Sequence, residues 1–124
     1  MNIALLTQRE FLDTKDISPY TLQIRLEEAW LVSGFAQLGI EAHRVAWDDP
    51  DVDWRTYRAA IFRSTWDYFH RFAEFAPWLA QTSKKTQLIN DAKLIQWNMD
   101  KHYLQQLEDR GVAIAVSYTH LTLP

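Results

Sequence analysis

Four short segments with strand character, separated by stretches of helical spacing, constrain the fold of this chain more than any other feature. They fall at Ile3–Leu6, Glu41–Trp47, Ala59–Phe62 and Gln87–Ile89. The first is a continuous apolar run, which is typical of a strand buried on both faces of a parallel sheet. Strands that alternate with helices indicate βαβ units, and right-handed crossovers favour a strand order near 2-1-3-4. The pattern therefore predicts an α/β fold with a short parallel sheet of about four strands and helices on both faces.

The longest helix is expected from about Tyr20 to Leu38. Its apolar stripe would consist of Leu22, Leu26, Ala29, Leu31, Phe35 and Leu38. Gly39 is well placed to end it, because glycine readily adopts the left-handed conformation that closes a helix.

Three further helices are expected after the third strand. Phe72, Phe75, Ala76 and Leu79 have helical spacing. Pro77 lacks a backbone donor, so this helix either begins near Ala73 or is kinked. Asp91 is a candidate cap for a short helix that ends near Trp97. Asn98 is a candidate N-cap for a last helix, Asp100–Arg110, which Gly111 would end.

Composition excludes several classes of protein. Hydrophobic residues make up 48% of the chain and charged residues 23%, as is ordinary for a soluble globular domain. The net charge is −3 with no basic stripe, so we expect no nucleic-acid partner. There is no cysteine, no apolar run long enough to span a membrane and no recognisable signal peptide. We expect a cytoplasmic protein.

The segment after the third strand, Arg63–Tyr68, is the main candidate for chemistry, because ligands of parallel sheets bind beyond the carboxyl ends of the strands. Arg63 can hold a carboxylate through two hydrogen bonds, and Asp67 can receive an amine. From spacing alone, however, the favoured interpretation is a polar loop in which Thr65 or Asp67 caps a turn, because turns use the same residue types. No glycine-rich phosphate loop is present, since the chain has only three glycines.

Lys101 is a second candidate. If Asn98 caps the last helix, Lys101 lies in its first turn, where a cation opposes the helix dipole unless an anion such as a phosphate is bound. From the residues alone, a solvated lysine is the favoured interpretation. The histidines share no metal-ligand spacing. Asp48, Asp49, Asp51 and Asp53 lack the glycine and glutamate of a calcium loop and are interpreted as a solvated turn. No metal site is predicted.

The last nine residues, Val116–Pro124, resemble a translation of the mosaic-end adapter of transposase-based sequencing libraries. We therefore expect native sequence to end near Ala115 and exclude residues 116–124 from the fold. The alternative is a genuine β-strand, which Val, Tyr and Thr would favour.

Taken together, several segments resemble the N-terminal part of bacterial ATP-grasp proteins of the RimK-like and glutathione-synthetase-like branch. They are Ala46–Pro50, Ile61–Tyr68, Ile89–Asn90, Trp97–Leu104 and Arg110–Val112. The resemblance extends from Met1 to about Ile114. It implies a Rossmann-like pre-ATP-grasp domain over residues 1–97, a junction helix of a truncated ATP-grasp domain over 98–115, and the non-native tail.

The resemblance also implies a function. Enzymes of this kind use ATP and Mg²⁺ to activate a carboxylate as an acyl phosphate, which an amine or thiol then attacks. Lys101 would contact the nucleotide phosphates, and Arg63, Asp67 and Tyr68 would contact the small-molecule substrate. The second lysine, glycine-rich lid and magnesium ligands of the ATP-grasp core are not found in the sequence, so we expect no catalytic residue here and no activity from this chain alone.

Two other interpretations remain open at this point. One is a free-standing flavodoxin-like module that binds a small molecule or a protein. Its receiver-type version is disfavoured, because Thr7-Gln8-Arg9 supplies no acids and Arg63 stands where an aspartate is needed. The other is a non-functional product whose last helix exposes Tyr103, Leu104 and Leu107 and promotes aggregation.

Overall fold

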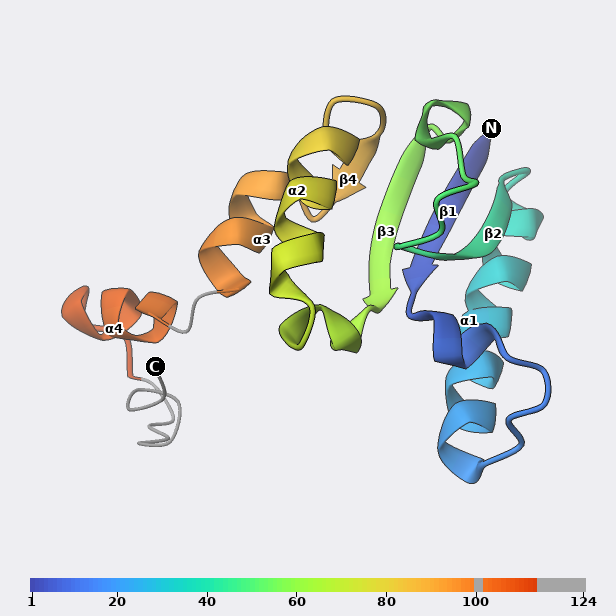
Figure 1. Ribbon diagram of the computed structural model, residues 1–124, viewed down its shortest axis with the longest axis horizontal. Coiled ribbons are helices and arrows are strands. Elements are labelled where there is room, and N and C mark those ends of the chain that lie inside the picture. Colours follow the sequence, from blue (N-terminus) through green and yellow to red (C-terminus); the bar gives the residue numbers. More distant parts are fainter. Residues whose placement is uncertain (100–101, 114–124) are drawn as a thin grey trace. The chain divides into compact units, whose positions relative to one another are not determined.

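The computed structural model describes residues 1–99 and 102–113 and contains a four-stranded sheet (Figure 1). The strands are β1 (Asn2–Thr7), β2 (Glu41–Ala46), β3 (Ala59–Ser64) and β4 (Gln87–Ile89). Each strand runs parallel to its neighbours, in the order β2-β1-β3-β4. The predicted fold class and strand order are therefore confirmed.

The described helices follow the predicted positions closely. The α-helices are α1 (Pro19–Gln37), α2 (Phe72–Thr82), α3 (Ala92–Met99) and α4 (His102–Asp109), and the short 3-10 helices are η1 (Arg9–Leu12), η2 (Trp54–Thr56) and η3 (Trp66–Phe69). None of the described helices is long and apolar enough to cross a bilayer.

The chain divides into two compact units, residues 1–92 and 93–124. The predicted domain boundary at residue 97 falls inside α3.

Side chains alternate between two apolar faces of the sheet, as they must in a β-strand. Ile3 and Leu5 of β1 face the α1 side, where Leu31 and Phe35 pack against them. On the opposite face, Phe62 of β3 meets two aromatic rings of α2, those of Phe75 and Trp78. Helices therefore cover both faces of the sheet, as predicted.

The buried face of α1 is not the predicted apolar stripe. Four of the six predicted residues are exposed: Leu22, Leu26, Ala29 and Leu38. The buried residues are instead Thr21, Ile24 and Glu28, with Leu31 and Phe35 partly buried. The prediction was wrong because part of the inward face of α1 meets polar partners: Thr21 bonds to Asp16 in the preceding loop, and Glu28 bonds to Ser64 at the end of β3. The buried positions in this part of α1 are therefore Thr21, Ile24 and Glu28 rather than the leucines.

The end of α1 agrees with the predicted glycine stop. Gly39 has φ +78°, its N–H donates to the Ala36 carbonyl at 3.0 Å, and the Ile40 N–H donates to the Phe35 carbonyl at 2.9 Å. This pair of bonds is the Schellman motif. Gly111 closes α4 in the same way, with φ +84°.

Gly39→Ala is expected to lower the free energy of unfolding by about 1–2 kcal/mol, because an alanine is strained in the left-handed conformation. Gly34→Ala is the matched control within α1. A methyl group there meets no atom within 4 Å, and Gly34 has helical backbone. Gly34→Ala should raise stability by about 0.8–1 kcal/mol. Urea denaturation of both variants measures the two changes in the free energy of unfolding. Equal changes for Gly39→Ala and Gly34→Ala would contradict the special role of Gly39.

The later helices include one correction. Helix α2 begins at Phe72 and continues through Pro77. Asn98 lies inside α3, because the helical segment that follows Asp91 extends to Met99, so Asn98 is not the N-cap of the next helix. Lys101 and the suspected adapter residues 116–124 lie outside the described residues.

Candidate functional site

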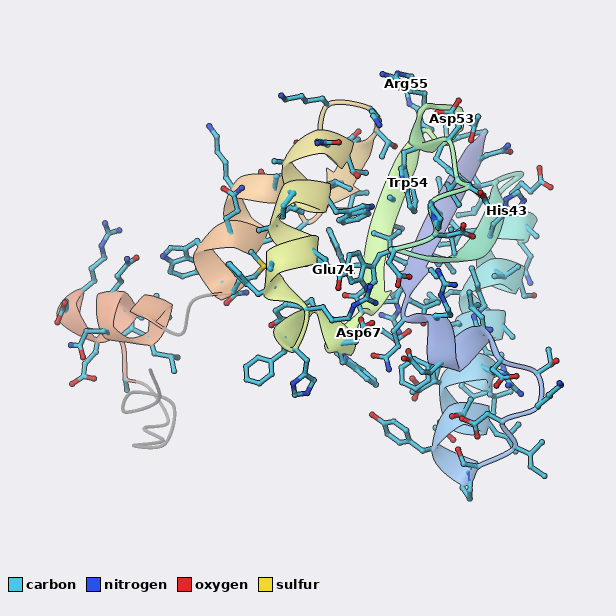
Figure 2. All side chains as sticks on the ribbon, viewed as in Figure 1. His43, Asp53, Trp54, Arg55, Asp67 and Glu74 are labelled. Carbon is cyan, nitrogen blue, oxygen red and sulfur yellow. The ribbon has the colours of Figure 1, made fainter. Side chains whose placement is uncertain are left out.

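The carboxyl ends of β1, β2 and β3 meet at one edge of the sheet, which we call the carboxyl edge. The Trp47 N–H donates to the Thr7 carbonyl at 3.1 Å, and the Gln8 N–H donates to the Ser64 carbonyl at 3.0 Å. These bonds extend the sheet pairing beyond the strands. The predicted substrate segment, 63–68, therefore lies beside the residues that follow β1 and β2, and Figure 2 labels Asp67 at this edge.

A β-bulge at Arg63 sets the direction of the side chains here. Leu6 pairs with Phe62, but the next residue of β1, Thr7, pairs with Ser64. Arg63 is thus the extra residue in β3. Its side chain is exposed, and within the described part of the chain no hydrogen bond or ion pair engages it. Bulges re-aim side chains next to active sites, and this one leaves a free guanidinium at the carboxyl edge.

The bulge also turns Ser64 toward α1, into a buried polar network. The Ser64 hydroxyl donates to Glu28 Oε1 at 2.5 Å. It has one proton, so the 2.5 Å contact between the Thr7 and Ser64 hydroxyls requires Thr7 to donate. Arg44 Nε donates to Glu28 Oε2 at 3.0 Å, and Arg44 also donates to the Phe11 carbonyl at 3.1 Å. Glu28 is only 2% exposed, so its charge is balanced almost entirely by this network.

A second network lies on the opposite side of the sheet, around Arg71. Its guanidinium donates to Asp48 at 2.6 Å, to Asp67 at 3.3 Å and to Glu74 at 2.5 Å. It also lies over the Trp47 ring, 4.9 Å from the ring centroid. Hydrogen bonds to Glu74 and Asp48 raise the pKa of Arg71 above its ordinary value. Arg71 is therefore a permanent positive charge that joins the segment after β2 to the start of α2.

These contacts show where the other predicted substrate residues lie. Asp67 is mostly buried, and its two oxygens accept from the Trp47 indole N–H at 2.8 Å and from Arg71. Tyr68 packs its ring on Phe75, with centroids 5.4 Å apart. Of the three predicted substrate residues, Arg63 is the one whose charged group has no internal partner among the described residues.

The aspartates after β2 behave in two ways. Asp49 and Asp53 accept hydrogen bonds from the backbone N–H groups two residues later, which is turn chemistry as predicted. Asp48 is different, because its side chain is 13% exposed and paired with Arg71. The interpretation of Asp48 as part of a solvated turn was wrong, since the distant Arg71 could not be paired with it from sequence spacing.

No metal site is predicted from the sequence. Across residues 1–99 and 102–113, no group of three or more His, Asp or Glu side chains is placed to hold a metal ion. His43 contacts the Tyr57 hydroxyl at 3.2 Å and Glu41 at 3.2 Å.

Sequence reasoning missed Glu28, Arg44 and Arg71. A glutamate or arginine in a helix or strand is normally solvated, so residue type gave no signal of burial. The one available signal was Glu28 itself, which lies on the same helical face as Ile24, Leu31 and Phe35.

Comparison with known proteins agrees with this architecture. The family model described as D-cycloserine synthetase DcsG, N-terminal domain, matches residues 3–90. The cycloserine biosynthesis protein DcsG of Streptomyces lavendulae is 37% identical over 84 residues, which cover 68% of this chain and 28% of that protein. The crystal structure of D-cycloserine synthetase DcsG superposes with a TM-score of 0.76 at 32% identity, over 92% of this chain and 35% of that chain. The chain thus spans about a third of the length of the relatives it matches.

Proposed function

The chain belongs to the family of the D-cycloserine synthetase N-terminal domain, and from this premise we propose that it is the substrate-side domain of an ATP-dependent ligase. The parent enzyme would activate a carboxylate as an acyl phosphate and join it to an amine or a thiol. Membership in a synthetase family favours this function over a free-standing flavodoxin-like binding module. Assignment to the RimK-like branch rests on the sequence segments that carry the resemblance.

The name of the relative is chemically consistent with this proposal. D-cycloserine contains a ring amide, so its synthesis requires a bond between a carboxyl carbon and a nitrogen. A small carboxylate that carries an amine-type nucleophile is therefore the substrate class that we propose.

The guanidinium of Arg63, which is exposed and has no partner among the described residues, is the observation that carries the proposal. Arginine offers a planar pair of donors that matches a carboxylate, and the bulge holds it at the edge where parallel sheets bind ligands. Asp67 and Tyr68 would line the same site. Because Asp67 already accepts from Trp47 and Arg71, it would contribute mainly by holding the loop in place.

The nucleotide side of the reaction is proposed on sequence alone. Lys101 would contact the phosphates of ATP. Magnesium would be held by parts of the parent enzyme other than the described residues, which offer no cluster of acids for it. The 124-residue chain would be inert by itself, and it would contribute binding and orientation of the carboxylate.

Steady-state kinetics of Arg63→Ala and Lys101→Ala in the full-length parent enzyme test the proposal. Arg63→Ala should raise KM for the carboxylate about 10- to 100-fold, which corresponds to the loss of a charged hydrogen-bonded pair. Its KM for ATP should stay unchanged. Arg63→Lys keeps the charge but not the paired donors and should be intermediate. Lys101→Ala should show the reverse pattern, with the increase confined to KM for ATP.

An Arg63→Ala enzyme with an unaltered KM for the carboxylate would remove Arg63 from the site. A parent enzyme that forms product without consuming ATP would overturn the ligase assignment itself.

A further inference from the structure

An open groove of about 530 Å³ lies at the opposite end of the sheet, where β3 and β4 begin. Residues 55–58, before β3, and residues 83–87, around the start of β4, line it. Figure 2 labels Arg55 at this end and Asp67 at the other. A six-residue strand such as β3 spans about 20 Å, so the groove is separate from the carboxyl edge.

The lining of the groove is strongly cationic. Arg55, Arg58, Lys84 and Lys85 all contribute to it, and it contains no Asp or Glu. Within the described residues none of the four forms an ion pair, although the chain as a whole carries a net charge of −3. Like charges gathered in this way repel one another, and a bound anion would offset that repulsion.

The acids at this end of the sheet have other partners. Asp53 accepts from the backbone N–H of Arg55 at 3.1 Å, which caps η2. Glu41, at the start of β2, pairs with His43 at 3.2 Å. Neither carboxylate belongs to the groove lining, so the positive charge of the groove is not neutralised from within.

The two walls of the groove are fixed to each other. Thr86, which is 8% exposed, donates its hydroxyl proton to the Tyr57 carbonyl at 2.8 Å. The Arg58 N–H donates to the Asn2 carbonyl at 2.8 Å, which attaches the other wall to β1. The four cations therefore project from a backbone that is already ordered.

The donors that remain in the groove point to the class of ligand. The Thr56 and Ser83 hydroxyls donate to the carbonyls of Asp53 and Ala80 and are thus occupied. The charged donors, for which no partner is found among the described residues, are two guanidinium groups, which bind oxyanions through paired hydrogen bonds, and two ammonium groups, which act as point charges. We propose that this groove binds a small soluble anion of the phosphate class that carries at least two negative charges. The inference does not depend on the ligase assignment.

A purely structural role for the lysines makes a different prediction. Lys84 and Lys85 directly follow the end of α2, where cations interact favourably with the helix dipole. That role alone would make their removal lower stability without any effect on the binding of anions.

Titration of inorganic pyrophosphate into the 124-residue chain at low ionic strength, followed by NMR of the backbone amides, tests the inference. We expect saturable binding with shifts centred on residues 55–58 and 83–87. The Lys84→Gln/Lys85→Gln and Arg55→Gln/Arg58→Gln variants should each weaken binding about tenfold or more. Lys15→Gln/Lys93→Gln is the matched control. It changes the net charge equally at exposed lysines outside the groove, and its effect should stay below about twofold.

Equal weakening by the groove variants and the control would show general charge attraction and overturn the site. So would the absence of saturable binding, or shifts confined to the carboxyl edge. Thermal melts establish that each variant is folded, and if one groove variant fails to fold, the other decides the outcome.

Discussion

Glu28→Ala should lower the free energy of unfolding by about 3 kcal/mol, because removal of one partner leaves the charge of Arg44 uncompensated in a mostly buried site. Arg44 is 19% exposed and loses its only ion pair among the described residues. Ser64 also loses its acceptor, and the hydroxyl chain to Thr7 must reorganise. Urea denaturation monitored by tryptophan fluorescence measures the change.

Two further variants test whether the loss of stability is specific to Glu28 or follows from any substitution of a glutamate in α1. Glu27→Ala removes the adjacent, exposed glutamate, whose partner is the exposed Gln23, and should change stability by less than about 0.5 kcal/mol. Glu28→Gln retains the shape and the acceptor oxygen but loses the charge, and should cost about 1–2 kcal/mol. If Glu28→Ala were as mild as Glu27→Ala, the network would not stabilise the fold.

This network shows why the sheet could be predicted from the sequence more completely than the packing of α1. The strands follow from short apolar runs and the topology from the handedness of the crossovers, both of which are local or general rules. The stripe of Leu22, Leu26 and Leu38 followed the same logic, yet these leucines are exposed. Which face of a helix is buried depends on what lies beneath it, and beneath Glu28, at the middle of α1, lies the Ser64 hydroxyl with that of Thr7 bonded to it.

The candidate site, too, could be predicted from the sequence only in part. The sequence placed Arg63 and Asp67 at the carboxyl edge correctly, because strand ends fix the position of the residues that follow them. It could not indicate that a bulge leaves Arg63 without a partner in the described part of the chain, or that Asp67 is held by Trp47 as well as Arg71, since register shifts and long-range contacts have no local signature. The assignment of Lys101 to the nucleotide and the non-native origin of residues 116–124 stay predictions.

Phe75→Ala is the second substitution with a large expected effect, about 3–5 kcal/mol of lost stability. Phe75 is 1% exposed, and its ring lies 5.1 Å from Trp47, 5.5 Å from Trp78 and 5.4 Å from Tyr68, centroid to centroid. Truncation leaves a cavity beneath the loop that carries Tyr68, so stability and order at the carboxyl edge should be lost together. Urea denaturation measures the first, and amide hydrogen exchange over residues 64–70 measures the second.

Phe72→Ala is the matched control, because it makes the same change on the same helix at a ring that is 53% exposed. It should cost less than about 1 kcal/mol and leave exchange over residues 64–70 unaltered. Phe75→Leu keeps most of the volume and should fall between the two. Equal losses for Phe72→Ala and Phe75→Ala would mean that the aromatic cluster is not the core of this side of the sheet. A large loss of stability without faster exchange near Tyr68 would mean that the loop is held by the Asp67 and Arg71 network alone.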